Sequence, residues 1–467
     1  MQEGIFPSIL KSAIVCAIYK KNEKTNCANY RPISLLSNIG KVFERVMFNR
    51  MESFLNESNI IYKYQFGFRK KYSTNHALLS IVEKIRTSLD NKRFACGVFV
   101  DLEKAFDTVN HNILLAKLDH YGINGFSNNW IRSYLSNRTQ SVTLDGVSST
   151  NQGVTCGVPQ GSILGPLLFI IYINDMHNAV KECIVHHFAD DTNLLYEDKN
   201  PKNIKKVMNK ELSLLYEWLC ANRLSLNVDK TEFIIFRPPR QKLHDRIVLE
   251  LNHTKIFESN RIKYLGLILD SRLTWKAHIS ELSKKLSRSI GMLYKIRDYS
   301  SKTVLRSLYY SLFHSHLSYG IPVWGNADKQ YIDKIAKLQK KAICAISFSD
   351  FNAHSKPLFK KLNILAIDDL TQHQIASLMW DLDNGSLPPS LSSYFTKRSH
   401  IHSHDTRLAA SDKYCINKTN TSRYGLKSFQ VQGSKILNEL KDLDYYNHSR
   451  TKKQFLKQFK VKFLANY

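Results

Sequence analysis

The chain has 467 residues, of which 43% are hydrophobic, so it can form several packed cores and is not a wholly disordered protein. Its 67 Lys and Arg outnumber 40 Asp and Glu, and the formal net charge of +27 is spread along the chain. This excess predicts a polyanionic partner, most simply a nucleic acid, with an anionic membrane surface as the alternative. We find no apolar run long enough to span a membrane and no signal-peptide pattern.

The eight cysteines are scattered and never form a C-x-x-C pair. A disulfide framework and zinc knuckles are therefore not expected. The cysteine pattern instead fits a reducing, intracellular compartment.

The N-terminal part is expected to mix short strands with helices. Residues 13–19 are apolar and β-like, and apolar residues recur at helical spacing over about 37–55. Ser73 or Thr74 is suited to cap a helix over 75–89.

A continuous apolar run over 95–101 predicts a central buried strand that delivers Asp101 at its end. The elements expected next are a helix over 104–118, a short helix over 130–135, a polar β-ribbon over 140–151 and an apolar helix over 164–176.

Two apolar-rich runs then flank the polar turn Ala189-Asp190-Asp191-Thr192, a pattern typical of a β-hairpin with two carboxylates at its tip. Adjacent aspartates repel each other unless a cation lies between them, and Mg²⁺ prefers a few carboxylates plus phosphate oxygens. An Asp-Asp pair alone is more often structural. The second pair, Asp368-Asp369, precedes a helical pattern and is expected at its N-cap and first turn.

If one sheet brings Asp101 to Asp190 and Asp191, the three carboxylates would hold two Mg²⁺ ions roughly 3.5–4 Å apart. Such a pair of ions supports an in-line phosphoryl displacement.

The later part is expected to combine a strand and a hairpin with helices up to about residue 346, and the patterning is weaker from about 350. The predicted elements are a helix over 203–220, a strand ending near 236, a boundary at 238–246, a hairpin of 261–269 with 273–275, and basic, aromatic-rich helices over 279–346. His400, His402 and His404 alternate, which on a strand would align them as metal ligands, but no further ligand is evident. A structural or RNA-contact loop is the favoured interpretation.

Several motifs in this order resemble those of reverse transcriptases of non-LTR (LINE-class) retrotransposons, in the jockey/chicken-repeat-like branch. They are N-Y-R-P-I-S-L-L at 29–36, Q-F-G-F-R at 65–69, V-D-L-E-K-A-F-D at 100–107, G-V-P-Q-G-S-I-L-G-P at 157–166, F-A-D-D at 188–191, L-N-V-D-K-T at 226–231, Y-L-G at 264–266, I-P-V-W-G at 321–325 and H-S-H-D-T-R at 402–407.

The resemblance implies an α+β, right-hand polymerase. Its expected parts are fingers at 1–95, a palm at 96–236 with an insertion at about 108–152, a primer-grip hairpin and basic helical thumb at 237–346, and a C-terminal region at 347–467. No endonuclease domain is evident, so the chain resembles the polymerase part of a longer element protein or a truncated copy.

The implied activity is RNA-directed DNA polymerisation with Mg²⁺, or Mn²⁺ in its place. The implied partners are an RNA template, a DNA primer or target DNA, the RNA–DNA hybrid and dNTPs, with no membrane. The family's chromosomal target makes the nucleus the expected location. A remnant that only binds nucleic acid is the alternative, and an RNA-synthesising polymerase is a second one.

Residue roles follow from the matched motifs. Asp101, Asp190 and Asp191 match the metal-binding catalytic acids. Phe106 matches the aromatic that excludes a 2′-hydroxyl, and its alternative is a plain core aromatic. Gln160 matches a residue lining the nucleotide pocket, and its alternative is turn chemistry.

Four cations also match the family's pattern. Lys20, Arg31 and Arg69 match residues that clamp the triphosphate, since Arg donates bidentately to phosphate. Lys21 competes with Lys20, and a solvated surface charge is the alternative for each. Lys230 matches a lysine that protonates the leaving pyrophosphate, although lysines at strand starts are ordinary. Asn22 stands where glycine is usual and is expected to tolerate a left-handed turn.

Overall fold

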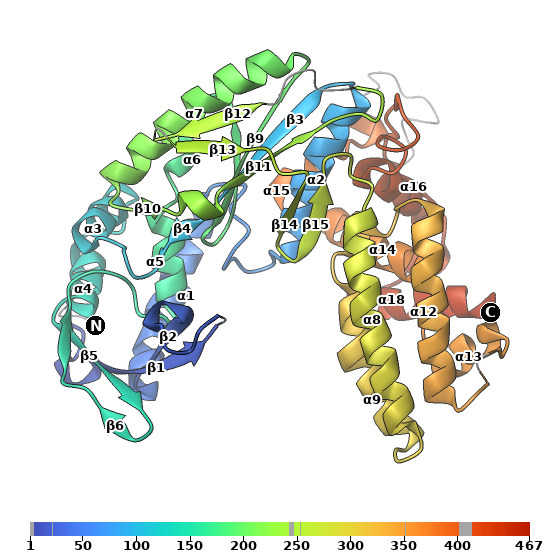
Figure 1. The fold of residues 1–467 in the computed structure, drawn as a ribbon, viewed down its shortest axis with the longest axis horizontal. Coiled ribbons are helices and arrows are strands. Elements are labelled where there is room, and N and C mark those ends of the chain that lie inside the picture. The colour runs from blue at the N-terminus through green and yellow to red at the C-terminus, as the bar shows by residue number, and fades with distance from the viewer. Residues whose placement is uncertain (1–3, 21, 242–246, 253, 351, 401–412) are drawn as a thin grey trace.

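The computed structural model describes residues 4–20, 22–241, 247–252, 254–350, 352–400 and 413–467. The ribbon forms an arch, in which two arms descend from a central sheet (Figure 1). One arm carries the N-terminal elements, and the other carries the helices that follow β15. His402 and His404 lie outside the described residues, as does the side chain of His400.

The central sheet has four antiparallel strands in the order β11-β3-β9-β8. They are β3 (Phe94–Val100), β8 (Ile184–Phe188), β9 (Asp191–Asp198) and β11 (Glu232–Phe236). Successive residues of a strand face opposite sides of a sheet. Accordingly, Ala95 and Leu195 pack into one core with α2, whereas Cys96 and Leu194 pack into a second core with α7. The predicted apolar strand is confirmed as central because β3 is covered on both faces.

A second sheet lies in the N-terminal arm. Its path is β2-β1-β5-β6, and β7 pairs with β5. The strands are β1 (Ser12–Tyr19), β2 (Tyr30–Leu35), β5 (Arg138–Leu144), β6 (Val147–Ser148) and β7 (Gln152–Val154). The predicted ribbon over 140–151 turns at Asp145 and Gly146, whose φ angles of 49° and 83° are the left-handed values of a type I′ turn. Asn22 also adopts a left-handed φ of 71°, as expected.

β5 pairs with β1 in this sheet. The predicted division assigns β1 to the fingers and β5 to the insertion of the palm. The proposed division at residue 95 stays a prediction.

The helices of the first half are α1 (Asn38–Glu57), α2 (Thr74–Asp90), α3 (His111–His120), α4 (Gly125–Leu135), α5 (Gly165–Tyr172), α6 (Met176–Ala179) and α7 (Pro201–Ala221). The Ser73 hydroxyl caps α2, where it accepts from the His76 N–H. The prediction of a helix over 104–118 is wrong at its start. Lys104 has a φ of 46°, and the chain turns before Asn110 caps α3 by accepting from the Ile113 N–H.

The remaining elements are short strand pairs and the helices of the second half. The strand pairs are β4 (Leu102–Glu103) with β10 (Ser225–Leu226), β12 (Val248–Leu251) with β13 (Thr254–Phe257), and β14 (Arg261–Tyr264) with β15 (Leu267–Asp270). The helices are α8 (Lys276–Arg297), α9 (Lys302–Leu308), the π-helical η4 (Tyr309–His314), α10 (Ser315–Ser318), α11 (Ile321–Trp324), α12 (Lys329–Ser347), α13 (Ser355–Leu362), α14 (Ile367–Asp383), α15 (Pro389–Ser392), α16 (Phe429–Lys441), α17 (Asp444–Asn447) and α18 (Lys452–Ala465).

The prediction that 273–275 forms the second hairpin strand is wrong. The Asp270 carboxylate accepts from the backbone N–H groups of Arg272, Thr274 and Trp275, and this contact turns the chain into α8. Asp368 and Asp369 lie in the first turn of α14, as predicted, but the N-cap is Ala366.

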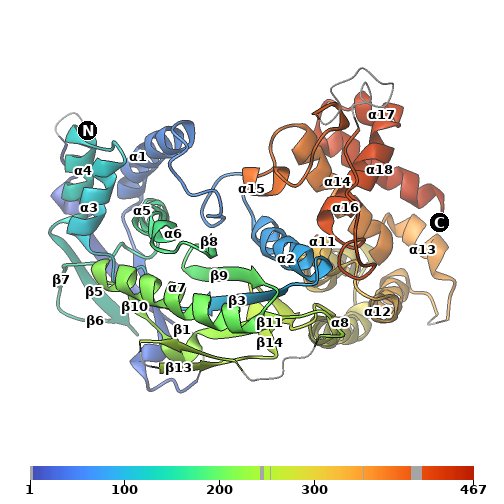
Figure 2. The same cartoon turned by 90° about the horizontal axis from the view of Figure 1, so that it is seen from above.

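The C-terminal region docks on α2 through buried charges. Glu83 accepts from the N–H groups of Phe429 and Gln430 at the start of α16, at 2.8 and 2.9 Å. Arg86 donates to the carbonyls of Lys427 and Val323. Figure 2 shows α2 between the central sheet and the helices α11 and α16. The α+β class is confirmed, and among the described residues no helix is long and apolar enough to cross a bilayer.

Candidate active site

Three predicted acids meet at one end of the central sheet. Asp101 directly follows β3, and Asp191 begins β9. Val100 lies opposite Thr192 in the antiparallel register, so the next opposing positions are Asp101 and Asp191. Asp190 precedes Asp191 at the tip of the β8–β9 hairpin.

The hairpin turn is tighter than the four-residue turn expected from the sequence. Phe188 pairs with Asp191, which leaves Ala189 and Asp190 as a two-residue loop. Ala189 has a φ of 57°, a left-handed value that costs a residue with a side chain about 1–3 kcal/mol. The turn thus keeps a strained conformation at the point where it presents the acids.

Burial and neighbouring carboxylates raise the pKa values of Asp190 and Asp191. Asp190 and Asp191 are exposed at the tip, yet neighbouring protein removes part of their hydration. Partial burial, followed by the charges of Asp190 and Asp101, raises the pKa of Asp191 to about 6. Burial and Asp101 also raise the pKa of Asp190, whereas the positive charge of Arg31 lowers it. The charge of Arg31, on β2, therefore acts on the acidic turn.

Lys230 provides a cation to the same acids. Its Nζ donates to Asp101 Oδ2 at 3.2 Å, and the Asp101 carbonyl accepts from the Asn227 N–H at 2.9 Å. The side chains of Lys230 and Asp101 are 64% and 39% exposed, and such exposed ion pairs contribute only about 0–1 kcal/mol. A metal ion could therefore displace the ammonium at little cost.

We tested whether these residues fit a divalent metal. Within the described ranges, no three His, Cys, Asp or Glu groups have the spacing of a preformed metal site. The donor chemistry nevertheless fits, because carboxylate oxygens are preferred ligands of Mg²⁺, and partial burial, followed by the charges of Asp190 and Asp101, raises the pKa of Asp191. The Lys230 ammonium at Asp101 shows that this site accepts a cation.

A second cluster surrounds the turn after Asp101. Gln160 Nε2 donates to Asp107 Oδ1 at 2.9 Å, and the Gln160 carbonyl accepts from the Ser34 N–H at 2.7 Å. Burial raises the pKa of Asp107, and the Gln160 hydrogen bond, Lys104 and Lys20 lower it. The charge of Lys20 therefore acts on the carboxylate that holds Gln160. Sequence reasoning missed Asp107, although it ends the motif at 100–107.

Phe106 is half-buried. Its ring stacks on Phe169 at 4.5 Å between centroids and meets Phe68 edge-on at 6.1 Å. It lies five residues after Asp101 and directly before Asp107.

Arg69 is engaged within its own loop. Its guanidinium donates to the carbonyls of Tyr62 and Gln65, each at 3.3 Å, and lies 4.1 Å from the centroid of the Tyr72 ring. Burial lowers its pKa. These contacts give Arg69 a role in holding the loop.

Tyr264 of the Y-L-G motif is buried next to the acids. Burial, followed by the charge of Asp191, raises its pKa. The β14–β15 hairpin therefore lies against the acidic end of the sheet.

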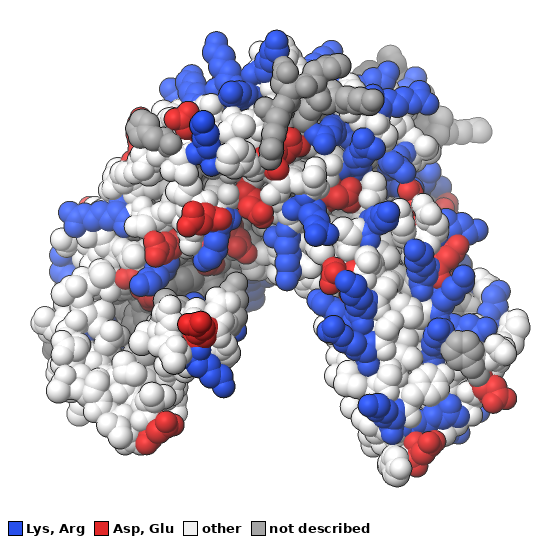
Figure 3. All heavy atoms as spheres, in the orientation of Figure 1, with Lys and Arg blue, Asp and Glu red and all other residues white. Residues whose placement is uncertain are grey.

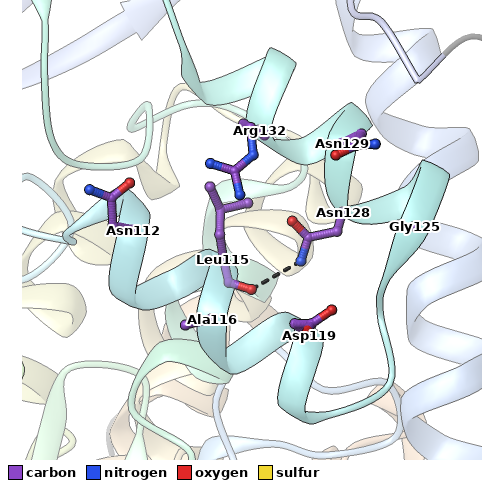
Figure 4. A pocket seen from close by; sticks show the side chains of 8 residues that line it. All are labelled: Asn112, Leu115, Ala116, Asp119, Gly125, Asn128, Asn129 and Arg132. Atoms are coloured by element: carbon purple, nitrogen blue, oxygen red, sulfur yellow. Dashed lines mark hydrogen bonds between the residues drawn. The ribbon is translucent and has the colours of Figure 1, made fainter.

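A pocket lies away from these acids, between α3 and α4. It has a volume of about 420 Å³, and its lining includes Asp119, Asn128 and Arg132 (Figure 4). Asn128 is already satisfied there, because its amide donates to the carbonyls of Leu115 and Ile123. None of the predicted site residues lines this pocket.

Comparison with known proteins adds an independent finding. The family model described as "Reverse transcriptase (RNA-dependent DNA polymerase)" matches residues 18–269. The RNA-directed DNA polymerase from mobile element jockey of Drosophila melanogaster is 30% identical over 387 residues, covering 79% of this chain and 41% of that protein. The probable RNA-directed DNA polymerase from transposon X-element of the same species is 29% identical, with the same two shares. This chain therefore spans about two fifths of the length of these relatives.

Among solved structures, the telomerase of Candida tropicalis in complex with a fragment of telomeric RNA aligns with a TM-score of 0.46 at 14% identity, covering 96% of this chain and 64% of that one. The apo telomerase of the same species gives 0.44 at 15% identity, with shares of 81% and 67%. The family match covers more than half of the chain and includes Asp101, Asp190 and Asp191. The chain belongs to the reverse transcriptase (RNA-dependent DNA polymerase) family.

Proposed function

We propose that this chain is the RNA-directed DNA polymerase of a non-LTR retrotransposon, with a right-hand architecture. It adds deoxynucleoside monophosphates from dNTPs to the 3′-hydroxyl of a DNA primer on an RNA template. The observation that carries the proposal is the convergence of Asp101, Asp190 and Asp191 at one sheet end, within a chain of this family.

The acids and Lys230 divide the chemistry between them. Reverse transcriptases in general depend on a divalent metal, and Mg²⁺ held by the three acids would activate the 3′-hydroxyl and stabilise the leaving oxygen. Lys230, already beside Asp101, is positioned to donate a proton to the leaving pyrophosphate. Arg31 and Lys20 supply positive charge on the side from which a triphosphate would enter.

Phe106 selects the sugar in this proposal. Its ring stacks on the buried ring of Phe169, which holds it against moving aside for a 2′-hydroxyl. Gln160 lines the same pocket, and its amide is oriented by Asp107.

The two arms hold the nucleic acid. Figure 3 shows Lys and Arg gathered along the arm of α8 and α9, facing the gap of the arch. The exposed cations on these helices include Lys284, Lys285, Arg288, Lys295 and Arg306. They would contact the phosphates of an RNA–DNA hybrid largely independently of sequence. We assign 1–95 to fingers, 96–236 to palm, 237–346 to thumb and 347–467 to a C-terminal region, and we expect the protein to act in the nucleus on a nicked chromosomal target.

Primer extension on poly(rA)/oligo(dT) with Mg²⁺ tests this function. We expect the wild-type chain to incorporate dTTP, to reject UTP and to lose synthesis in the Asp190→Ala variant. A gel shift in the same buffer should show equal binding by both proteins. Binding without synthesis by the wild type would instead identify a remnant that only holds nucleic acid, and incorporation of UTP would identify an RNA-synthesising polymerase.

A further inference from the structure

The loop between α1 and α2 lies directly against the turn that carries Asp190 and Asp191. The Phe66 N–H donates to the His187 carbonyl at 2.8 Å, and the His187 N–H donates to the Tyr64 carbonyl at 3.0 Å. Gln65 thereby forms a parallel bridge with His187, just before the turn. The loop acts as a short extra strand at the edge of β8.

Gln65 reaches the turn itself with its side chain. Its Oε1 accepts from the Gly67 N–H at 2.9 Å and from the Ala189 N–H at 3.3 Å. The side chain is almost completely buried, with 2% of Gln65 exposed. Loss of this acceptor would leave two N–H groups without their partner inside the protein, where unpaired polar groups are unfavourable.

Gly67 completes the contact because it has no side chain. A Cβ at this position would lie 2.3 Å from the Ala189 nitrogen and 3.0 Å from the Ala189 Cα. Both are backbone atoms, so an alanine at 67 would push the turn away from the loop. Arg69 in turn holds the loop by donating to the Gln65 carbonyl.

We propose that Gln65 is a positioning residue that holds the strained Ala189 turn, and with it Asp190 and Asp191, in the geometry needed for metal-dependent nucleotidyl transfer. The proposal rests on the function proposed above. Ala189 has a left-handed φ, which persists only where surrounding contacts enforce it. Gln65 provides the side-chain contact to this residue, and Gly67 allows the loop backbone to approach it.

The test compares variants that keep or remove the acceptor oxygen. Gln65→Leu removes the acceptor, Gln65→Glu keeps an oxygen that can accept from both N–H groups, and Gly67→Ala pushes on the turn. Gln339→Leu is the matched control. Gln339 lies in α12, is also buried with 1% exposed, and its side-chain amide donates to the Leu365 carbonyl and the Tyr309 hydroxyl. Thermal unfolding of each protein verifies that it folds.

The first readout is hydrogen–deuterium exchange of the peptide that spans the turn, measured without metal. We expect at least tenfold faster exchange at Ala189 in Gln65→Leu and Gly67→Ala, and unchanged exchange in Gln339→Leu. This readout stands even if the wild-type chain shows no synthesis. Unchanged exchange at Ala189 in Gln65→Leu would overturn the proposal.

The second readout is single-turnover dTMP addition over a range of Mg²⁺ concentrations. Gln65→Leu should react 10- to 100-fold more slowly and need several-fold more Mg²⁺, with dTTP affinity little changed. Gln65→Glu should restore most of the rate. If the wild type is active and Gln65→Leu is equally active, the positioning role alone is refuted. If the wild type is inactive and exchange at Ala189 is faster in Gln65→Leu, the proposed function alone is refuted.

Discussion

The ammonium of Lys230 lies 3.2 Å from the carboxylate of Asp101, so the proposed proton donor and a proposed metal ligand are already in contact. The two come from η3 (Val228–Lys230) and the end of β3, which lie far apart in sequence. The Asn227 side chain accepts from the Lys230 N–H and fixes the start of this segment.

Replacing Lys230 with Ala should slow nucleotide addition by about 10²-fold, the lower range for loss of a general acid. Stability should change little, because the exposed ion pair with Asp101 contributes at most about 1 kcal/mol. Single-turnover rates across pH 6 to 9 and a melting curve measure both effects. Lys413→Ala, which breaks the Lys413–Asp442 pair elsewhere, is the control, and an unchanged rate in Lys230→Ala would remove the proton-donor role.

Replacing Phe106 with Val should weaken discrimination against ribonucleotides by about 10- to 100-fold, because the smaller side chain leaves room for a 2′-hydroxyl. The measurement is the ratio of kcat/KM for dTTP and UTP. Phe68→Val removes the ring beside Phe106 and should keep most of the discrimination. If Phe106 is only a core aromatic, Phe106→Val will lower both kcat/KM values equally.

Replacing Asp107 with Ala should raise the KM for dNTP about fivefold, which corresponds to one hydrogen bond, with a smaller effect on kcat. The reason is that the Gln160 amide would lose the partner that orients it. Asp107→Asn keeps an acceptor oxygen, so its KM for dNTP should lie between those of the wild type and Asp107→Ala. Equal KM values for wild type and Asp107→Ala would show that Gln160 needs no such support.

Buried histidines predict loss of stability in acid. Burial lowers the pKa of His186 and His187 to about 3, and that of His76 and His278 to about 4. In the unfolded chain these groups titrate near 6.5, so below that pH the unfolded state binds protons that the folded state cannot. The free energy of unfolding should fall by up to about 1.4 kcal/mol per pH unit for each histidine.

Urea unfolding at pH 7.5, 6 and 5 measures this dependence. The raised pKa values of the active-site acids make the free energy of unfolding rise as the pH falls, which opposes the effect of the histidines. Comparison with a histidine variant therefore isolates the contribution of that histidine. In His186→Leu the free energy of unfolding should depend less steeply on pH, because about one proton fewer is taken up on unfolding. Identical slopes in wild type and His186→Leu would contradict the prediction.

Local patterns predicted the framework of the site. The apolar run before Asp101 and the hairpin around Asp190 are encoded by short-range hydrophobic periodicity, and the structure has both at the expected positions. The start of α3 was missed because Lys104 turns left-handed, a tertiary choice that helical propensity cannot report. Apart from the helix that begins near Asp368, the C-terminal helices were not predicted, because their apolar residues pack against α2 and one another rather than forming one simple stripe.

The contacts that support the site could not be predicted from the sequence, because they join residues that lie far apart along the chain. Gln65 touches Ala189 across more than a hundred positions, and Asp107 touches Gln160 across more than fifty. The contacts of Arg69 with the Tyr62 and Gln65 carbonyls were likewise not foreseen, and its role at a triphosphate stays a prediction. Such partners are set by the register of the assembled sheets.

The most direct measurement is the single-turnover rate of dTMP addition on poly(rA)/oligo(dT) for Asp101→Asn, Asp190→Asn and Asp191→Asn, each with its primer–template affinity. Asp145→Asn, in the β5–β6 turn, is the isosteric control. We expect each of the three variants to lose at least 10³-fold in rate, with primer–template affinity retained and the control unchanged, because each removes a charged ligand from the reacting centre. A variant among the three that keeps more than about a tenth of the wild-type rate would contradict the assignment of these acids as the catalytic centre.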